Sequence, residues 1–323
     1  MAKVLVIGGA GYIGSHVVKA LLQKGHQATV YDNLSTGQKV NLFEKAEFVE
    51  GDILDSGRLF DTMRGGFDAV VHLAAKKAVG ESMENPDKYS INNIQGALNI
   101  LMAMSASGIR HIVFSSSAAV YGMPEYLPVD EKHPVNPINY YGFTKLEIER
   151  FMEWYDRLKG MRYVALRYFN AVGYDAAGDI RGKERNPQNL LPIIMEAASG
   201  VREGVSVFGS DYDTRDGTCI RDYIHVSDLA TAHVLAIEKL MAGMPSEVLN
   251  LGTGEGTSVK EMIEAAEKVT GKKLNVKYAG RRPGDPAVLI ASSEKARELL
   301  GWKPEITNVE DIIRTTWNLE NPV

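Results

Sequence analysis

Short apolar runs rich in β-branched residues alternate with longer segments whose apolar residues recur at helical spacing over the first half of the chain. The short runs predict buried strands, and the longer segments predict helices between them. The predicted strands are 3–9, 27–33, 46–52, 67–75, 110–117 and 162–170, and the predicted helices are 14–25, about 86–106 and 140–159. This alternation predicts an α/β fold, a doubly wound parallel sheet with right-handed crossovers and helices on both faces.

The pattern changes after Asn170. Residues 171–189 are polar and rich in glycine, asparagine and charge, which predicts a long functional loop. Shorter elements follow, namely strands at 205–209 and 247–252 and helices at 225–240, about 258–270 and about 308–318. We therefore expect two domains, 1–170 and a smaller α/β domain at 171–323, with elements near 225–252 returning to the first sheet.

Composition narrows the class of protein. The chain has 323 residues, of which 45% are hydrophobic and 24% are charged, as is usual for a soluble globular protein. A net charge of −5 without a basic run argues against nucleic acid as a partner, and no apolar run approaches the roughly 20 residues that cross a membrane. The single cysteine, Cys219, excludes an internal disulfide and suits a reducing compartment. With no signal peptide ahead of the first strand, we expect a cytoplasmic protein.

The sequence predicts no metal site. The lone cysteine and the scattered histidines have no spacing typical of zinc ligands, and His225 is expected to be a packed residue. The acidic segment 210–217 lacks the carboxylate spacing of a calcium loop and is expected to be a solvated loop.

A glycine motif, "GGAGYIGSH", joins the first strand to the first helix. Gly8, Gly11 and Gly14 have the spacing that allows a tight turn, a close approach to a pyrophosphate and close packing of helix on strand. Asp32 ends the second strand, where a carboxylate can bind the ribose hydroxyls of a dinucleotide. The residues after it, "NLSTG", include no Arg or Lys for a 2′-phosphate, so NAD is expected rather than NADP. Asp52, after the third strand, either reaches the adenine or simply ends its strand.

A Tyr-xxx-Lys pair, Tyr141 and Lys145, begins the helix that follows "NPIN". Residues four apart lie on one face of a helix, so the pair could be an ordinary amphipathic pair. However, the strand at 110–117 ends in three serines, and ligands bind at the carboxyl edge of such sheets. Beside NAD, Tyr141 can remove a hydroxyl proton that Ser117 orients, if Lys145 and the nicotinamide charge lower the tyrosine pKa from about 10 toward neutrality.

These motifs resemble the extended branch of the short-chain dehydrogenase/reductase superfamily. The likeness extends over nearly the whole chain, through "DNLSTG", "HLAAKKAVGES", "SSSAAVYG", "YYGFTK", "LRYFNAVG", "DGTCIRDYIHVSDLA" and "RRPGD". It implies a Rossmann-type NAD-binding domain at 1–170, a UDP-sugar-binding domain at 171–323, and the catalytic set Ser117, Tyr141 and Lys145. The cofactor contacts that it implies are Gly8, Gly11, Tyr12, Ile13, Gly14, Asp32, Asn33, Asp52, Ile53, Ala74, Lys77, Asn92, Tyr141, Lys145 and Phe169.

Two arginines in the second half suit the phosphates of a nucleotide sugar, because guanidinium forms forked hydrogen bonds to phosphate oxygens. Taken alone, Arg221 and Arg282 could equally be in surface ion pairs. The resemblance implies that both bind the diphosphate, and that the remaining substrate contacts are Ser117, Asn170, Asn189, Leu190, Ser206 to Phe208, Asp285 and Leu289.

The resemblance implies reversible epimerisation at C4 of a UDP-hexose through a transient 4-keto sugar. Where some relatives have a bulky tyrosine, Leu289 leaves room for an N-acetyl group, so the UDP-GlcNAc/UDP-GalNAc pair is a second expected substrate. The alternatives are a UDP-glucuronate-type 4-epimerase, a nucleotide-sugar 4,6-dehydratase, which needs an acidic pair where this chain has "SSAAVYG", and a module that binds NAD without turnover. The family also implies a homodimer packed through the helices near 86–106 and 140–159.

Overall fold

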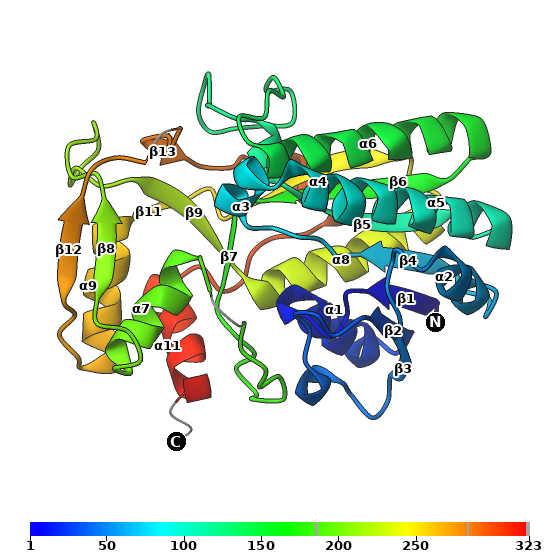
Figure 1. The fold of residues 1–323 in the computed structure, drawn as a ribbon, viewed down its shortest axis with the longest axis horizontal. Helices are drawn as coiled ribbons and strands as arrows, with labels where there is room; N and C mark the ends of the chain where they lie inside the picture. Colours follow the sequence, from blue (N-terminus) through cyan, green and yellow to red (C-terminus); the bar gives the residue numbers. More distant parts are fainter. Residues whose placement is uncertain (185–186, 283, 321–323) are drawn as a thin grey trace.

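A seven-stranded parallel sheet forms the centre of the computed structural model, which describes residues 1–184, 187–282 and 284–320 (Figure 1). Its strands are β1 (Lys3–Ile7), β2 (Gln27–Asp32), β3 (Glu47–Glu50), β4 (Ala69–His72), β5 (His111–Ser117), β6 (Arg162–Tyr168) and β10 (Glu247–Leu251). Their order across the sheet is β10-β6-β5-β4-β1-β2-β3, and every neighbouring pair is parallel. The predicted α/β class with a doubly wound parallel sheet is confirmed.

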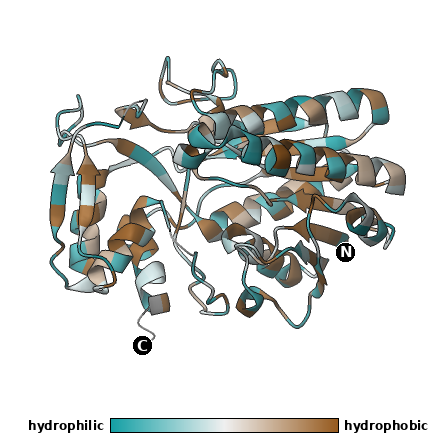
Figure 2. Ribbon diagram, viewed as in Figure 1, coloured by the Kyte–Doolittle hydropathy of each residue, from teal (hydrophilic) through white to brown (hydrophobic). Residues whose placement is uncertain are grey.

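Helices cover both faces of this sheet. The helices are α1 (Tyr12–Gln23), α8 (Val226–Met241) and α10 (Glu294–Leu300) on one face, and α2 (Ser56–Met63), α5 (Gly96–Ser107) and α6 (Tyr140–Lys159) on the other. Successive β1 residues point to opposite faces, so that Val4 and Val6 pack in the cluster with α1 and α8, while Leu5 and Ile7 pack in the cluster with α2 and α5. The strands β1 and β4 are therefore apolar along most of their length (Figure 2), whereas β5 ends in three serines.

Several boundaries differ from the predicted ones. The first strand ends at Ile7 rather than at residue 9, and the first helix begins at Tyr12, two residues before the predicted start. The helix expected near 86–106 consists of α4 (Pro86–Tyr89), a π-helical stretch at Ser90–Gln95, and α5. Neither α2 nor the short α3 (Val79–Glu84) was predicted, because each is too short to show a clear helical period.

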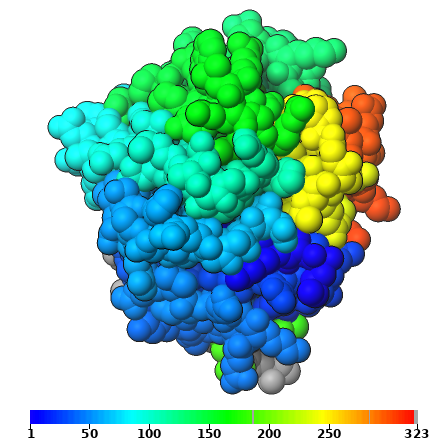
Figure 3. All heavy atoms as spheres, turned by 90° about the vertical axis from the view of Figure 1, so that its right-hand side faces the viewer, coloured from blue at the N-terminus to red at the C-terminus, as the bar shows by residue number. Residues whose placement is uncertain are grey.

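The second half of the chain contributes to both parts of the molecule. α8 packs against α1, and β10 pairs with β6 at the edge of the main sheet. In Figure 3 these later segments, yellow and orange, lie beside the N-terminal half on one flank of the molecule. No helix in the described part of the chain is long and apolar enough to cross a membrane.

Two small sheets and three helices form the remaining part. They are β7 (Asn170–Val172), β9 (Ile220–His225), β11 (Gly256–Ser258) and β13 (Val288–Leu289) in one sheet, β8 (Val205–Phe208) and β12 (Val276–Ala279) in the other, and α7 (Leu190–Ala198), α9 (Val259–Thr270) and α11 (Val309–Glu320). Their buried side chains make a separate apolar cluster that includes Ile194, Val207, Met262 and Ile313.

The loop prediction for 171–189 is wrong at its start and agrees with the structure at its end. Ala171 and Val172 belong to β7, which pairs in parallel with β9, and α7 begins at Leu190 directly after the segment. Residues 185–186 of this segment lie outside the described residues. The strands β11, β12 and β13 were not predicted at all, because runs of two to four residues show no alternation and form only where a partner strand is available.

Candidate active site at the carboxyl edge of the sheet

The glycine motif forms the turn between β1 and α1. A Cβ atom added to Gly14 would lie 2.1 Å from the carbonyl oxygen of Gly8, so this glycine lets the helix pack directly on the turn. A Cβ added to Gly11, which precedes the helix, would meet only the Gly8 oxygen, at 3.3 Å. The start of α1 is therefore uncovered at Gly11, and its free N–H groups and dipole suit a pyrophosphate.

Asp32 is joined to this turn. Its Oδ2 accepts a hydrogen bond from Ala10 N at 3.0 Å, and its Oδ1 accepts one from Leu34 N at 2.8 Å. The side chain is 7% exposed, and burial raises the pKa of its carboxyl group. The carboxylate thus stands at the end of β2 beside the glycine turn, which is the arrangement a dinucleotide ribose requires.

The other predicted cofactor residues lie around the same edge. Asn33 Nδ2 donates to Asp52 Oδ2 at 2.8 Å, and Lys77 Nζ pairs with Glu184 at 2.7 Å. Some have a packing role as well: Ile53 is 5% exposed in the apolar core, and Ala74 N donates to Ile7 O beside the glycine turn. Three further predicted cofactor residues are partly buried, namely Ile13 in α1, Asn92 in the π-helical stretch, and Phe169 after β6.

The predicted catalytic set comes together where β5 ends and α6 begins. Asn139 caps α6 by accepting a hydrogen bond from Gly142 N at 2.8 Å. A Cβ on Gly142 would lie 2.4 Å from the Ala119 carbonyl oxygen, so this glycine allows α6 to touch the turn that follows Ser117. Ser117 consequently comes within hydrogen-bonding reach of the Tyr141 phenol.

Lys145 lies one turn further along α6 and is 3% exposed. Its Nζ donates to the Ser115 carbonyl oxygen at 2.7 Å and lies 5.7 Å from the centre of the Tyr141 ring. Burial lowers the pKa of Lys145 to about 7. The negative charge of Glu149 opposes this shift, because it favours the ammonium form.

The expected acidity of Tyr141 depends on the nicotinamide charge as well as on Lys145, and it stays a prediction. Burial raises the pKa of its phenol to about 12, and only the Ser117 hydrogen bond acts in the opposite direction. The physical reason is that removal of water penalises a phenolate more than the neighbouring groups of the chain favour it.

One supporting residue was missed by the sequence analysis. Asn93 is fully buried, accepts a hydrogen bond from Lys76 N at 2.8 Å, and donates to Thr144 Oγ1 at 3.2 Å. It ties the segment after β4 to the helix turn between Tyr141 and Lys145. Its position next to Asn92 was the available signal, but nothing local distinguishes which of two adjacent asparagines points inward.

The predicted substrate residues form pairs in the smaller part of the molecule. Arg221 Nη2 lies 2.5 Å from Asp285 Oδ1, and the Arg282 guanidinium lies 3.8 Å from the centre of the Phe208 ring. Leu289 pairs with Arg221 in the β13–β9 register and packs in a cluster with Phe169.

The remaining predicted substrate residues are placed around these pairs. Asn170 Nδ2 donates to the Asp222 carbonyl oxygen at 3.0 Å. Ser206 lies two residues from Phe208 on the outer face of β8, and Asn189, exposed, comes just before Leu190, the first residue of α7. Arg221 does form an ion pair, as the alternative expected, but its side chain is only 12% exposed and so is not at the open surface.

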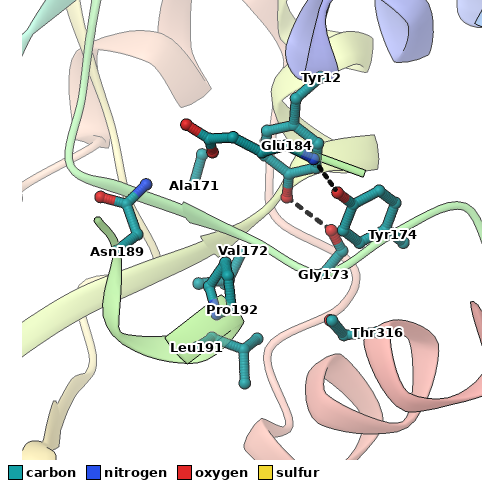
Figure 4. A pocket seen from close by; sticks show the side chains of 10 residues that line it. All are labelled: Tyr12, Ala171, Val172, Gly173, Tyr174, Glu184, Asn189, Leu191, Pro192 and Thr316. Atoms are coloured by element: carbon teal, nitrogen blue, oxygen red, sulfur yellow. Dashed lines mark hydrogen bonds between the residues drawn. The ribbon is translucent and has the colours of Figure 1, made fainter. Parts of the chain in front are cut away.

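A small pocket lies between the start of α1, β7 and the start of α7 (Figure 4). Tyr12 and Asn189 both line it, and the Tyr12 hydroxyl donates to the Gly173 carbonyl oxygen at 2.5 Å. One predicted cofactor residue, Tyr12, and one predicted substrate residue, Asn189, thus line the same pocket.

Two other predictions concern histidine and metal. His225 is buried, accepts a hydrogen bond from Ser227 N at 3.1 Å, and so caps α8 as a packed residue. Within residues 1–184, 187–282 and 284–320, no three His, Cys, Asp or Glu side chains gather as a group that could hold a metal ion.

A glycine turn after the first strand, a carboxylate after the second and a Ser–Tyr–Lys set at the same edge define a dinucleotide-dependent enzyme of the short-chain dehydrogenase/reductase type. The chain belongs to the NAD dependent epimerase/dehydratase family, whose model matches residues 4–252. The predicted cofactor, NAD, is thereby confirmed.

The chain is similar along its whole length to named members of this family. It is 48% identical over 318 residues to the UDP-glucose 4-epimerase of Streptococcus mutans serotype c, covering 97% of this chain and 95% of that protein. The crystal structure of the UDP-glucose 4-epimerase from Brucella ovis in complex with NAD matches with a TM-score of 0.95 at 47% identity, over 98% of this chain and 97% of that one.

The name of a third relative includes two sugars. The structure of the UDP-Glc/GlcNAc 4-epimerase from Campylobacter jejuni matches with a TM-score of 0.88 at 39% identity, over 100% of both chains. These comparisons confirm the resemblance to the nucleotide-sugar epimerases of the short-chain dehydrogenase/reductase superfamily.

Proposed function

We propose that this chain interconverts UDP-glucose and UDP-galactose by NAD-dependent inversion at C4, through a transient 4-keto sugar. The observation that carries the proposal is the placement of Ser117, Tyr141 and Lys145 at the sheet edge beside the glycine turn. The 48% identity to a UDP-glucose 4-epimerase over nearly all of both chains supports the substrate.

Each residue of the catalytic set is proposed to have a separate role in the reaction. When bound, NAD accepts the hydride of C4 and brings the positive charge of its nicotinamide to this edge. Ser117 orients the 4-hydroxyl beside the phenol oxygen, and Tyr141 takes the hydroxyl proton and later returns it. Lys145, in its charged form, favours the phenolate.

The nucleotide is proposed to bind through two cations of the smaller part of the molecule. Arg221 and Arg282 would move from Asp285 and from the Phe208 ring to the diphosphate, which leaves Asp285 for the ribose and Phe208 for the uracil. Firm contacts on the diphosphate and few on the hexose would let the 4-keto sugar turn and present its other face.

The 4,6-dehydratase alternative lacks its catalysts. The residues after Ser117 are Ala118 and Ala119, where elimination of water needs an acid and a base. A UDP-glucuronate-type 4-epimerase differs by pocket residues only, so UDP-glucuronate belongs in the same assay as UDP-galactose.

The test is conversion of UDP-galactose to UDP-glucose by the purified protein without added NAD. Tyr141→Phe is expected to lower kcat at least about 100-fold, because the proton acceptor is lost, while UDP binding measured by calorimetry stays unchanged. Tyr140→Phe is the matched control, since its hydroxyl bonds to Ser90 outside the set. Near-normal turnover by Tyr141→Phe, or no turnover by the unaltered protein even after NAD is added, would refute the proposal.

A homodimer is proposed as the assembly. The outer surfaces of α5 and α6 expose large apolar side chains, with Met102 58%, Trp154 55% and Leu158 71% exposed.

A cytoplasmic location is also proposed. Cys219 is a free, buried thiol, which suits a reducing compartment, and cell fractionation tests this location.

A further inference from the structure

A buried ion pair lies directly behind the catalytic set. Glu149 comes two turns after Tyr141 on α6, and Arg167 lies near the end of β6. Arg167 Nη2 is 2.6 Å from Glu149 Oε2 and Arg167 Nε is 3.0 Å from Glu149 Oε1, in forked geometry. The two side chains are only 7% and 6% exposed.

This pair connects four elements of the fold. The Ser116 hydroxyl, next to Ser117 on β5, donates to Glu149 Oε1. The Arg167 guanidinium lies 4.8 Å from the centre of the Tyr121 ring, and the Tyr121 hydroxyl donates to Asn250 Oδ1 on β10 at 2.6 Å. The end of β5 is thereby joined to α6, β6 and β10 through fully formed polar contacts.

Stability alone does not account for such a pair. Taking two charges out of water costs several kcal/mol each, and apolar side chains of similar volume often serve a core equally well. The pair therefore suggests a role in fixing geometry or charge at the site next to it.

Lys145 is the nearest group on which that charge can act. Lys145 Nζ lies 4.7 Å from the centre of the Phe114 ring on β5 and 5.7 Å from that of the Tyr141 ring. The titratable groups whose charge is coupled to that of Lys145 are Glu149, one turn further along α6, and His72 on β4. His72 is neutral, because burial and the Lys145 charge lower its pKa to about 3. The carboxylate that favours the ammonium form of Lys145 is that of Glu149.

We propose that Glu149, held by Arg167 and Ser116, is a positioning residue that keeps the Lys145 cation beside Tyr141 and fixes the end of β5 against α6. The inference rests on the proposed epimerase function and adds residues that do not touch the substrate. The forked contact to Arg167 sets the carboxylate orientation, and the Ser116 hydrogen bond transmits it to the strand that bears Ser117.

The first test is Glu149→Gln, which keeps the side-chain shape and an acceptor for Ser116 but removes the negative charge. Lys145 then loses its proton at lower pH, so kcat is expected to fall about 10-fold or more above pH 7 and to recover partly at lower pH, with KM for the UDP-sugar unchanged. The basic limb of the kcat–pH profile moves to lower pH. Glu153→Gln, one turn further along α6 in a surface pair with Arg157, is the matched control and keeps the original profile.

A second variant distinguishes an effect on catalysis from a loss of folding, since Glu149→Gln leaves Arg167 buried without its ion-pair partner. The double variant Glu149→Gln/Arg167→Met removes both charges and is expected to fold with a Tm near that of the unaltered protein, yet to keep the shifted profile. Ser116→Ala is expected to lower kcat without moving the profile. A double variant that has the original kcat and pH profile would overturn the proposal.

A third readout separates this inference from the proposed function. Titration of the Lys145 Nζ by nuclear magnetic resonance, with the Lys145→Met spectrum subtracted, is expected to show a lower Lys145 pKa in Glu149→Gln than in the unaltered protein. An unchanged Lys145 titration would contradict the inference even in an active enzyme. Absence of epimerase activity in the unaltered protein would refute the proposed function, while the titration still tests the ion pair.

Discussion

The side chains of Tyr141 and Lys145 have properties that depend on their surroundings more than on their own chemistry. Burial raises the pKa of the phenol to about 12 and lowers that of the ammonium to about 7, so each group is driven toward its neutral form. Proton transfer at neutral pH therefore needs added positive charge near the phenol and negative charge near the lysine. The proposed roles of NAD and of Glu149 meet these two needs.

Leu289 is the residue for which a change of substrate range is expected. It is partly buried beside Phe169 and in register with Arg221. Leu289→Tyr is expected to lower kcat/KM for UDP-GlcNAc at least about 10-fold, since the added ring fills the space for the N-acetyl group, and to leave UDP-galactose turnover within about two-fold. Steady-state kinetics with both substrates checks this, and equal effects on the two would remove Leu289 as a determinant of specificity.

His72 is expected to limit stability in acid. Its ring is buried at 2% exposure and stacks on Phe114 with centroids 5.3 Å apart. Its pKa is lowered to about 3 in the folded chain, so the unfolded chain binds the extra proton between about pH 6.5 and 3. Stability from this group is complete above that window and is lost as the pH falls through it.

The substitution His72→Phe is expected to remove this loss of folding stability in acid. The difference in unfolding free energy between pH 7 and pH 5, measured by urea denaturation, is expected to shrink by about 2 kcal/mol, at about 1.4 kcal/mol per pH unit. An unchanged difference would show that the imidazole is not held neutral by burial.

At the scale of elements, the segment after β7 shows how a polar stretch becomes ordered. Gly173 accepts from the Tyr12 hydroxyl, Gly182 N donates to Asn41 Oδ1 at 2.7 Å, and Lys19 on α1 pairs with Asp175 at 2.5 Å and with Asp179 at 2.8 Å. The segment is thus docked on the first helix and on the loop after β2, beside the glycine turn.

Lys19→Met is expected to loosen this docking. Lys19 and Asp175 are 13% and 9% exposed, so the substitution leaves a buried carboxylate without its partner and costs about 1–3 kcal/mol. Trypsin should then cleave the native protein faster after Arg181 or Lys183, as mass spectrometry of the fragments can show. Lys24→Met, on an exposed residue just after the same helix, is the control, and equal cleavage of the two variants would contradict the docking role.

At the scale of the whole molecule, the sheet edge gathers residues from both halves of the chain. β10 pairs with β6 although about eighty residues separate them, and β13 brings Leu289 beside Phe169. The surface formed by α5 and α6 lies away from this edge, so an assembly through it would leave the site open.

Leu158→Glu tests that assembly. A charge at this exposed position is expected to shift the sedimentation coefficient from that of a dimer to that of a monomer, with unchanged circular dichroism, because a buried carboxylate without a partner opposes association. Val201→Glu, equally apolar and 78% exposed in the smaller part of the molecule, should leave the mass unchanged. A dimer that persists in Leu158→Glu would place the interface elsewhere.

Burial periodicity and motif spacing are local properties of the chain, so the parallel sheet, the glycine turn with Asp32 and the Tyr141–Lys145 pair on one helix face could be predicted from it. Which distant groups meet depends on the complete fold, as for Glu149 with Arg167, Arg221 with Asp285, and Lys19 with Asp175. The complete fold also decides the pKa of Tyr141, since loss of water depends on every element packed around a group. Contacts between remote elements and the burial that they create have no counterpart in any short window of sequence.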